Sequence, residues 1–234
     1  MYLSMLRLNA RDYQVRRDLA NCQELHRTLL SAFASEDGSR AETGLLFRIE
    51  SEGPTTVVLA QSLTRPDWER LRLRSPGYLT GGAGQGWQVK DVGEAYAALQ
   101  TGAVLRFRMR ANPTKRLGNS VEAEQPGKKG KRVALLKEEE RFAWLERKAE
   151  AAGFRLCTIQ SSDAGVPAVD VRPGDNVLGR RAAGESWARL VFGSVLFEGV
   201  LEVADADRLR AALREGIGSG KAYGFGLLSI APAA

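Results

Sequence analysis

The amino-acid sequence predicts an α+β protein with two ferredoxin-like (RRM-like) domains in tandem. Expected elements follow one another as strand, helix, two strands, helix and strand in the first half, and a similar order returns in the second half. The chain has 234 residues, 44% hydrophobic and 26% charged, which suits two ordinary globular domains. Residues 112–130 contain two prolines and three glycines but few apolar side chains. We therefore expect an N-terminal domain over residues 1–118 and a C-terminal domain over residues 119–234.

The first half contains six expected elements. Tyr2–Asn9 is a short apolar strand that begins almost at the first residue. Asn21 with Glu24 three residues later resembles a capping box, which predicts a helix to about Ala34. The remaining elements are strands at 45–50 and 55–63 joined by a turn at 53–54, a short helical stretch from residue 66, a glycine-rich loop at 75–86, a helix at 92–99 and a strand at 103–111.

The second half repeats this order. It begins with the apolar residues 133–136, followed by a charged amphipathic helix at 137–152 that Gly153 ends in the expected C-terminal position. Strands are expected at 154–159, 166–171 and 187–203, the last with a turn or bulge at Glu198-Gly199. A helix at 205–215 and a strand at 227–230 complete the domain.

Composition excludes several classes of protein. No apolar run approaches the roughly 18–20 residues of a membrane span, and the N-terminus lacks the apolar core of a secretion signal. The two cysteines, Cys22 and Cys157, are far apart, which favours a reducing cytoplasm over a disulfide framework. With a single histidine, the chain also lacks the four Cys and His ligands of a typical zinc site. We expect no metal and no small-molecule cofactor, although a carboxylate site for Mg²⁺ stays open.

The positive charge is concentrated in one segment. The net charge is +6, but residues 106–132 alone carry nine basic and two acidic side chains, so the rest of the chain sums to −1. Such a segment is typical of a surface that binds a polyanion such as nucleic acid, or an anionic membrane. A solvated basic loop without a partner remains an alternative. The nine basic residues are Arg106, Arg108, Arg110, Lys115, Arg116, Lys128, Lys129, Lys131 and Arg132.

Within this segment, residues 105–110 alternate between apolar and arginine side chains. On a strand, Leu105, Phe107 and Met109 face the core, and the three arginines share the other face. Because the planar guanidinium suits phosphate oxygens, we expect the three arginines, followed by Lys115 and Arg116, to grip a nucleic-acid backbone. The alternative is the solvated face of an ordinary sheet.

A second motif is glycine-rich. Residues 216–226 contain five glycines in eleven residues, among them Gly218 and Gly220 on either side of Ser219. The segment is not a Walker A loop, because Glu215 and Ala222 stand where glycine and Ser or Thr are required. Closely spaced glycines still let backbone N–H groups approach a phosphate, with Lys221 supplying charge. A purely structural turn is equally compatible with this pattern.

The single histidine, His26, permits two interpretations. On the predicted helix it shares a stripe with Leu29, Leu30 and Phe33, which favours a buried core histidine. It also lies about one and a half turns past the helix start, where the positive end of the helix favours the neutral imidazole that a general base needs. Periodicity does not decide between these interpretations.

Several motifs together resemble one family. Residues 16–21 (RRDLAN) and 24–29 (ELHRTL) are similar to the N-terminal signature of the CasE family, the type I-E CRISPR repeat-processing endoribonucleases of the RAMP superfamily. Further matching segments follow in the same order, and the resemblance extends from residue 1 to Pro232. They are LRFRMRANP at 105–113, TKRL at 114–117, GKRVAL at 130–135, VLFEG at 195–199 and the glycine-rich residues 216–228.

The resemblance implies tandem ferredoxin-like domains and a specific function. It implies recognition of the CRISPR repeat hairpin in precursor crRNA and a single cut at the 3′ base of the stem. The RNA 2′-OH would attack the adjacent phosphate without a metal, leaving a 2′,3′-cyclic phosphate and a 5′-OH. The product would stay bound, with the protein as a subunit of Cascade beside its other subunits. A non-catalytic RNA-binding scaffold of the same fold is the alternative, while a DNA-binding regulator lacks an evident helix-turn-helix.

The resemblance also assigns residues. The family histidine at the position of His26 is catalytic, which reverses the core interpretation. Relatives often carry a tyrosine where this chain has Gln23, and an amide cannot ionise. We therefore expect His26 to act with substrate positioning and a cationic group such as Lys221 or Arg27, while Ser31 and Ser35 orient phosphate.

Overall fold

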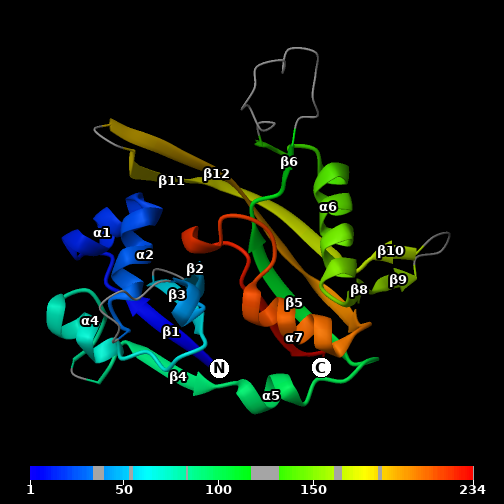
Figure 1. Cartoon of the computed structure of the whole chain (residues 1–234), viewed down its shortest axis with the longest axis horizontal. Helices are drawn as coiled ribbons and strands as arrows, with labels where there is room; N and C mark the ends of the chain where they lie inside the picture. The colour runs from blue at the N-terminus through cyan, green and yellow to red at the C-terminus, as the bar shows by residue number, and fades with distance from the viewer. Residues whose placement is uncertain are drawn as a thin grey trace.

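The computed structural model describes residues 1–33, 40–52, 55–82, 84–116, 132–160, 165–183 and 186–233. Two antiparallel sheets with helices packed on them make up most of the fold (Figure 1). We call the first sheet with its helices the first module, and the second sheet with its helices the second module.

The first module has the strand order β2-β3-β1-β4, with all neighbours antiparallel. This is the order of a ferredoxin-like fold, in which the first and third strands are central. Its strands are β1 (Tyr2–Leu8), β2 (Leu46–Glu52), β3 (Thr55–Ser62) and β4 (Trp87–Asp91), and its helices are α1 (Tyr13–Ala20), α2 (Cys22–Leu30), α3 (Arg40–Thr43) and α4 (Trp68–Arg74).

The second module repeats this topology with the order β11-β12-β5-β13, and β8 also pairs with β12. Helix α5 (Gly93–Ala97) connects the modules, and short hairpins pair β6 with β7 and β9 with β10. The strands are β5 (Val104–Ala111), β6 (Thr114–Arg116), β7 (Arg132–Ala134), β8 (Phe154–Leu156), β9 (Thr158–Gln160), β10 (Gly165–Pro167), β11 (Val169–Ala183), β12 (Ser186–Val203) and β13 (Leu228–Pro232). The helices are α6 (Glu138–Ala151), α7 (Ala206–Glu215) and the 3₁₀ turn η2 (Lys221–Tyr223).

The fold class was predicted correctly, but strand β5 was assigned to the wrong module. It was expected to complete the first sheet, whereas it lies between β12 and β13 as the first strand of the second. The fourth strand of the first sheet is instead β4, whose five residues are largely exposed at the sheet edge and therefore lack the apolar pattern of a buried strand. The predicted domain division after residue 118 lies outside the described residues.

Three smaller predictions also differ from the structure. Residues 132–134 form one strand of the β6–β7 hairpin rather than the first strand of the second sheet. The register around Glu198-Gly199 is continuous, and the irregularity lies on β11 between Gly174 and Val177. Helix α1 and most of β11 were not predicted, because β11 is polar and glycine-containing along its exposed length.

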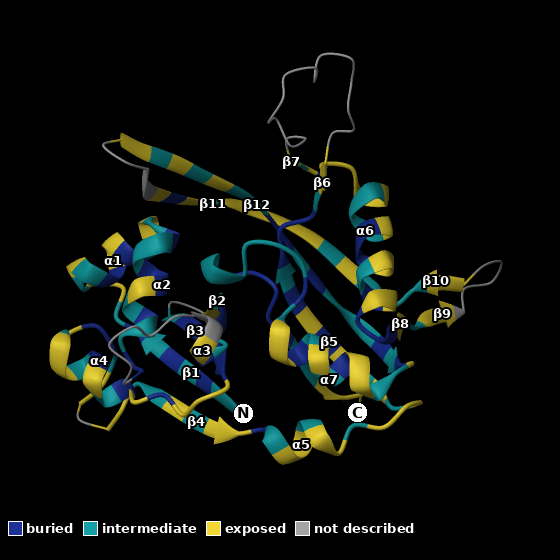
Figure 2. Ribbon diagram, viewed as in Figure 1, coloured by how far each residue is buried: buried dark blue, intermediate teal, exposed yellow. Residues whose placement is uncertain are grey.

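Each module has its own hydrophobic core between sheet and helices (Figure 2). As predicted, β5 turns Phe107 and Met109 into the core of the second module, where they are 4% and 0% exposed. Trp68 and Tyr78 fill the first core, and Trp144 and Phe154 fill the second.

A buried arginine of the first module joins the two sheets. Arg48 on β2 is 2% exposed and donates to the carbonyl oxygens of Arg108 and Leu227, at 3.1 and 3.2 Å. Its guanidinium also donates to Ser229 Oγ and is paired with Glu50 at 2.5 Å. Burial lowers the pKa of Arg48, and Glu50 opposes this shift. Arginine nevertheless remains charged in proteins, so the side chain is a permanent cross-link between the modules.

Removing this cross-link is expected to destabilise the whole chain. Arg48→Met should lower the free energy of unfolding by about 3 kcal/mol, because buried carbonyls of the second module lose their donor. Arg155→Met is the matched control, since Arg155 is 70% exposed and its pair with Glu202 contributes less than about 1 kcal/mol. Urea denaturation measures both values, and equal losses in the two variants would contradict the role of Arg48.

Candidate functional site

Helix α2 carries the single histidine of the chain. The helix begins as predicted at Asn21, whose Oδ1 accepts from the backbone N–H of Gln23 at 3.3 Å. The His26 side chain is 9% exposed and stacks on Phe47 of β2, with ring centroids 6.4 Å apart. Leu25 and Leu29 on the same helix are fully buried, so the helix presents His26 at the margin of the first core.

A buried carboxylate fixes α2 in place. Asp18 on α1 is fully buried, and its Oδ2 accepts from Thr28 Oγ1 of α2 at 2.6 Å and from the Tyr78 hydroxyl at 3.0 Å. Arg17 pairs with the other carboxylate oxygen at 3.2 Å. Burial and the adjacent Asp18 raise the pKa of Tyr78, which therefore remains a neutral donor. The glycine-rich loop at 75–86 thus supplies an anchor for the helix that carries His26.

The glycine-rich segment of the second module lies directly against α2. Turn η2 packs on both α2 and β2. Gly224, which ends this turn at a φ of +87°, lies so close to Phe47 that an added Cβ would be 3.2 Å from the ring. Phe47 is the ring on which His26 stacks, so one aromatic side chain contacts both predicted motifs. The structure therefore brings the histidine helix and the glycine-rich segment together.

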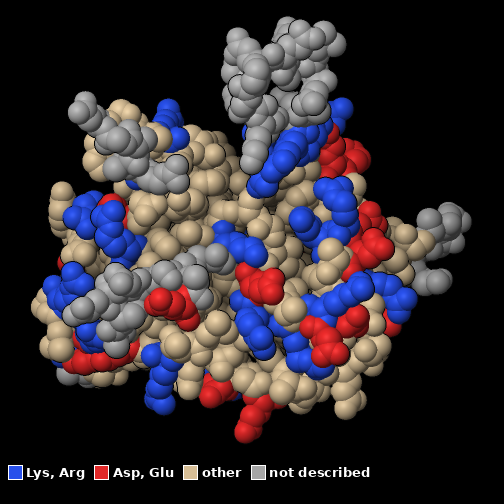
Figure 3. Space-filling view, in the orientation of Figure 1, with Lys and Arg blue, Asp and Glu red and all other residues tan. Residues whose placement is uncertain are grey.

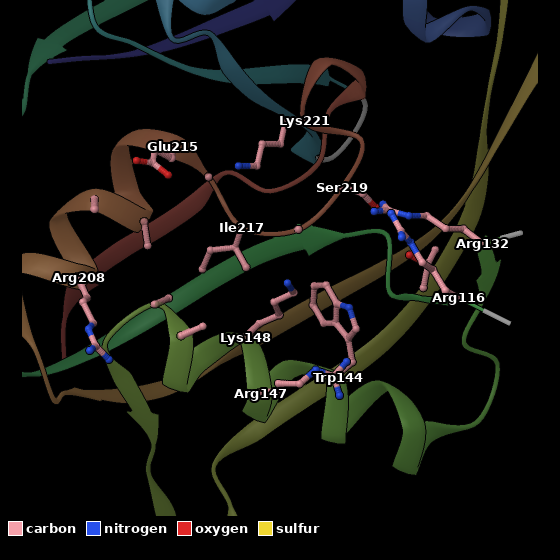
Figure 4. Close-up of a pocket in the computed structure, with 17 residues that line it drawn as sticks. Arg116, Arg132, Trp144, Arg147, Lys148, Arg208, Glu215, Ile217, Ser219 and Lys221 are labelled. Carbon is pink, nitrogen blue, oxygen red and sulfur yellow. The ribbon is translucent and has the colours of Figure 1, made fainter. Parts of the chain in front are cut away.

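Beside this segment, the second module contains a basic cavity of about 590 Å³. Lys221 extends from the glycine-rich segment and Lys148 from α6, on opposite walls of the cavity (Figure 4). One acidic side chain, Glu215, also lines it, and Trp144 forms part of the wall. The basic side chains that line the cavity are Arg116, Arg132, Arg147, Lys148, Arg208 and Lys221.

Two of these arginines oppose one another on the β6–β7 hairpin. Arg116 and Arg132 are direct partners in its register, and both side chains are exposed. Like charges directly opposite on neighbouring strands repel, so an anion bound between them would stabilise the pair. Lys and Arg side chains gather on this face of the second module (Figure 3). The cavity is therefore suited to the phosphate groups of a polyanion.

Arginine residues of β5 that were predicted to form a row are engaged in different contacts. Arg108 pairs with Glu198 of β12 and with Glu50 of the first module, at 2.5 and 3.3 Å. Arg110 donates to Ser194 Oγ at 2.7 Å and lies over the Phe225 ring. Arg106 donates to the carbonyl oxygen of Pro232. These contacts hold the module interface and the second sheet together, and none of the three lines the basic cavity.

The other predicted residues fall into three groups. Lys221, Gly218, Arg116 and Arg132 line the cavity together. Gly220 is the residue before η2, and Lys115 pairs with Glu140 at 2.6 Å. Lys128, Lys129, Lys131 and Ser35 lie outside the described residues.

On α2, the predicted residues have different surroundings. Gln23 precedes His26 by one turn and is half-buried. Arg27 is directed to solvent, where it donates to both carboxylate oxygens of Glu24 at 2.9 Å. Ser31 caps the helix and donates to the Thr28 carbonyl oxygen. Gln23 and His26 therefore lie one turn apart on the less exposed side of this helix, whereas Arg27 lies on its exposed side.

Several cavity residues were missed in the sequence. Trp144, Arg147, Lys148 and Ala151 are spaced at i, i+3, i+4 and i+7 along α6, and all four line the cavity. Residues 208, 211, 212 and 215 of α7 line it with the same spacing. The sequence therefore contained a pattern that marks the cavity, a stripe of basic and apolar residues along each helix. This pattern was missed because the solvated face of an ordinary helix looks the same.

The described residues offer neither a reactive thiol near His26 nor a cluster of metal ligands. Burial raises the pKa of the Cys22 thiol to about 11, so it stays protonated at neutral pH. Within the described part of the chain, no three His, Cys, Asp or Glu side chains are grouped to hold a metal ion. None of the described helices has the length and apolar character of a membrane-spanning segment.

Comparison with known proteins identifies relatives that are all CRISPR-associated proteins. A family model described as "CRISPR associated protein" matches residues 1–232. The CRISPR-associated endoribonuclease Cse3 of Thermus thermophilus is 43% identical over 241 aligned positions, which cover 99% of this chain and 100% of that protein. The CRISPR system Cascade subunit CasE of Escherichia coli is 38% identical over 140 residues, 57% of this chain and 61% of that protein.

A solved structure has the same fold. The structure of Cse3 bound to a 19-nucleotide RNA superposes with a TM-score of 0.77 at 41% identity, covering 99% of this chain and 100% of that chain. The two ferredoxin-like modules therefore belong to a fold shared with a protein whose structure was solved bound to RNA.

The buried carboxylate of Asp18 can be tested directly. Asp18→Ala should lower the free energy of unfolding by about 2–4 kcal/mol, because the hydroxyls of Thr28 and Tyr78 lose their buried acceptor. Asp207→Ala is the matched control, since that side chain is 92% exposed and should cost less than about 1 kcal/mol. If urea denaturation gives the same small loss for both variants, Asp18 does not anchor α2.

Proposed function

The chain belongs to the family of CRISPR-associated proteins, and on that basis we propose that it is a metal-independent endoribonuclease for precursor CRISPR RNA. It binds the repeat hairpin, cuts at the 3′ base of the stem and retains the product. The observation that carries the proposal is the basic cavity beside a glycine-rich segment that packs on the histidine helix. The segment that lines the cavity therefore also contacts the helix of the only histidine in the chain.

In the proposed reaction the nucleophile belongs to the RNA. Its 2′-oxygen forms a bond to the adjacent phosphorus while the bond from phosphorus to the 5′-oxygen breaks. The 2′-OH loses a proton and the leaving 5′-oxygen gains one, so the products are a 2′,3′-cyclic phosphate and a 5′-OH. His26 transfers one of these protons as general base or acid. The ammonium group of Lys221, from the adjacent segment, stabilises the charge that develops on the phosphate.

Gln23 occupies the position at which relatives often carry tyrosine. It accepts and donates hydrogen bonds but does not exchange a proton, so in this chain it orients the RNA beside His26. This difference keeps a second candidate function in view, a non-catalytic RNA-binding scaffold of the same fold. Both functions require RNA binding, and only the enzyme generates a cyclic phosphate.

The proposal includes a cellular setting for the reaction. The chain acts in the cytoplasm and, with the cut RNA bound, becomes a subunit of Cascade, as the name of the Escherichia coli relative implies. The basic cavity binds the phosphate backbone of the hairpin through its six cationic side chains. The exposed hairpins are available for contacts with RNA beyond the stem and with neighbouring subunits.

The chemistry is tested with the full chain and its cognate repeat RNA in excess EDTA. Wild-type protein should cut the RNA and leave a 2′,3′-cyclic phosphate, whereas His26→Ala should bind with similar affinity and cut at least about 100-fold more slowly. Cys22→Ala, on the same helix and also buried, is the control that keeps cleavage. Cleavage only with Mg²⁺ would contradict the mechanism, and binding without cleavage by wild-type protein would support the scaffold.

The backbone contacts of the cavity are tested by salt dependence. Arg116→Gln and Arg147→Gln should each weaken hairpin binding and reduce the slope of log K against log salt concentration by about one. Arg72→Gln on α4 is the control, because Arg72 pairs with Glu69 in the first module, away from the cavity. Unchanged slopes in both cavity variants would show that the RNA backbone binds elsewhere.

A further inference from the structure

A long two-stranded arm extends from the second sheet and passes beside α2 (Figure 1). Its strands are the outer parts of β11 and β12, which pair in register from Val177–Phe192 to Ala183–Ser186. Residues directly opposite one another share a face of the arm. One face therefore carries Arg180 with Arg189, and Trp187 two residues along β12.

This face has an unusual combination of exposed side chains. Trp187 is 70% exposed, although tryptophan is normally among the more buried side chains. Arg180 and Arg189 are both exposed and are direct partners in the register. Opposed like charges destabilise a strand pair, so the sequence of the arm is explained better by a bound anion than by the stability of the arm itself. The β6–β7 hairpin at the basic cavity shows the same arrangement.

The arm is tied to the start of the histidine helix. Asn21 Oδ1 accepts from the backbone N–H of Arg180 at 3.1 Å while it also caps α2. Gly179 is buried against α2, and an added Cβ would come within 2.6 Å of Cys22 Sγ. A side chain at position 179 would therefore push the arm away from the helix. The exposed face of the arm is thus held at a fixed place relative to His26.

Two adjoining cavities are lined jointly by side chains of this face and by residues of the first module. The larger, of about 700 Å³, is lined by Trp187, Arg180 and Arg189 from the arm and by Arg17 and Asn21 from the first module. The smaller, of about 290 Å³, shares four of these residues and adds Glu24. The indole ring of Trp187 can stack on a base, and the guanidinium groups of Arg180 and Arg189 can bind its phosphate. The adjoining cavities leave room for the nucleotide.

We propose that this face of the arm is a binding site for an unpaired nucleotide that flanks the RNA hairpin. The Trp187 ring stacks on the base, and Arg180 and Arg189 bind the adjoining phosphate. This inference rests on the proposed function, because it places the nucleotide next to the RNA cut at His26. It adds a site, outside the basic cavity, that senses single-stranded RNA. Stacking tolerates every base, so this site measures the presence of unpaired RNA rather than its sequence.

The test uses the full chain and RNAs with a 2′-deoxy nucleotide at the cleavage position, which cannot be cut. One RNA is the hairpin alone, and two others add three unpaired nucleotides at the 5′ or the 3′ end. Trp187→Ala should weaken binding of one extended RNA by about 5- to 100-fold and leave the hairpin alone unchanged within about twofold. Trp187→Tyr should keep most of the affinity, because the aromatic face remains.

Val191→Ala is the matched control, since Val191 lies on the same face, is 52% exposed and lines neither cavity. It should bind all three RNAs like the wild type. Loss of affinity for all three RNAs, or for none, in Trp187→Ala would overturn the proposal. So would normal RNA binding combined with failure to assemble with other Cascade subunits, which would assign the face to a protein partner. Failure of the wild type to bind the hairpin alone would instead contradict the proposed function.

Discussion

The buried guanidinium of Arg48 sets the relation between the two sheets. Its donors are shared among β2, β5 and β13, so a single side chain fixes strands of both modules at once. Gln61 adds a second tie, because its Nε2 donates to the Leu213 carbonyl oxygen of α7 at 2.6 Å. The contact between the histidine helix and the glycine-rich segment depends on how the two modules are placed relative to one another, because α2 belongs to the first module and η2 to the second.

The site is therefore a joint product of both modules. The first supplies a helix whose position is fixed by a buried carboxylate, and the second supplies the basic walls and a segment with little side-chain bulk. Gly218 shows why bulk is limited there, because an added Cβ would lie 3.1 Å from Trp144 in the cavity wall at a φ of +87°. Packing between the modules thus fixes the position of the histidine helix against the glycine-rich segment. The positive charge of the cavity comes mainly from the β6–β7 hairpin and from exposed faces of α6 and α7.

The sequence predicted local structure well and pairing between distant segments poorly. Alternation along residues 105–110 identified both a strand and its core face, because side-chain direction is a local property of the backbone. It did not reveal that the strand belongs to the second sheet, since partners at 195–202 and 228–232 are chosen by the tertiary fold. The ion pairs of Arg108 could not be predicted from the sequence for the same reason, because its partners Glu50 and Glu198 lie on other strands. His26 remained ambiguous because a stripe of apolar residues predicts burial and not chemistry.

Two of the partners of Arg48 lie far from it along the chain. Leu227 and Ser229 follow Arg48 by about 180 residues, so both are synthesised long after it. A nascent chain can form the first sheet early, yet it cannot complete the second sheet or satisfy Arg48 until β13 has emerged. The histidine helix consequently acquires its basic neighbour only once the second module has folded beside the first. A chain truncated before β13 would therefore lack both the completed second sheet and the assembled site.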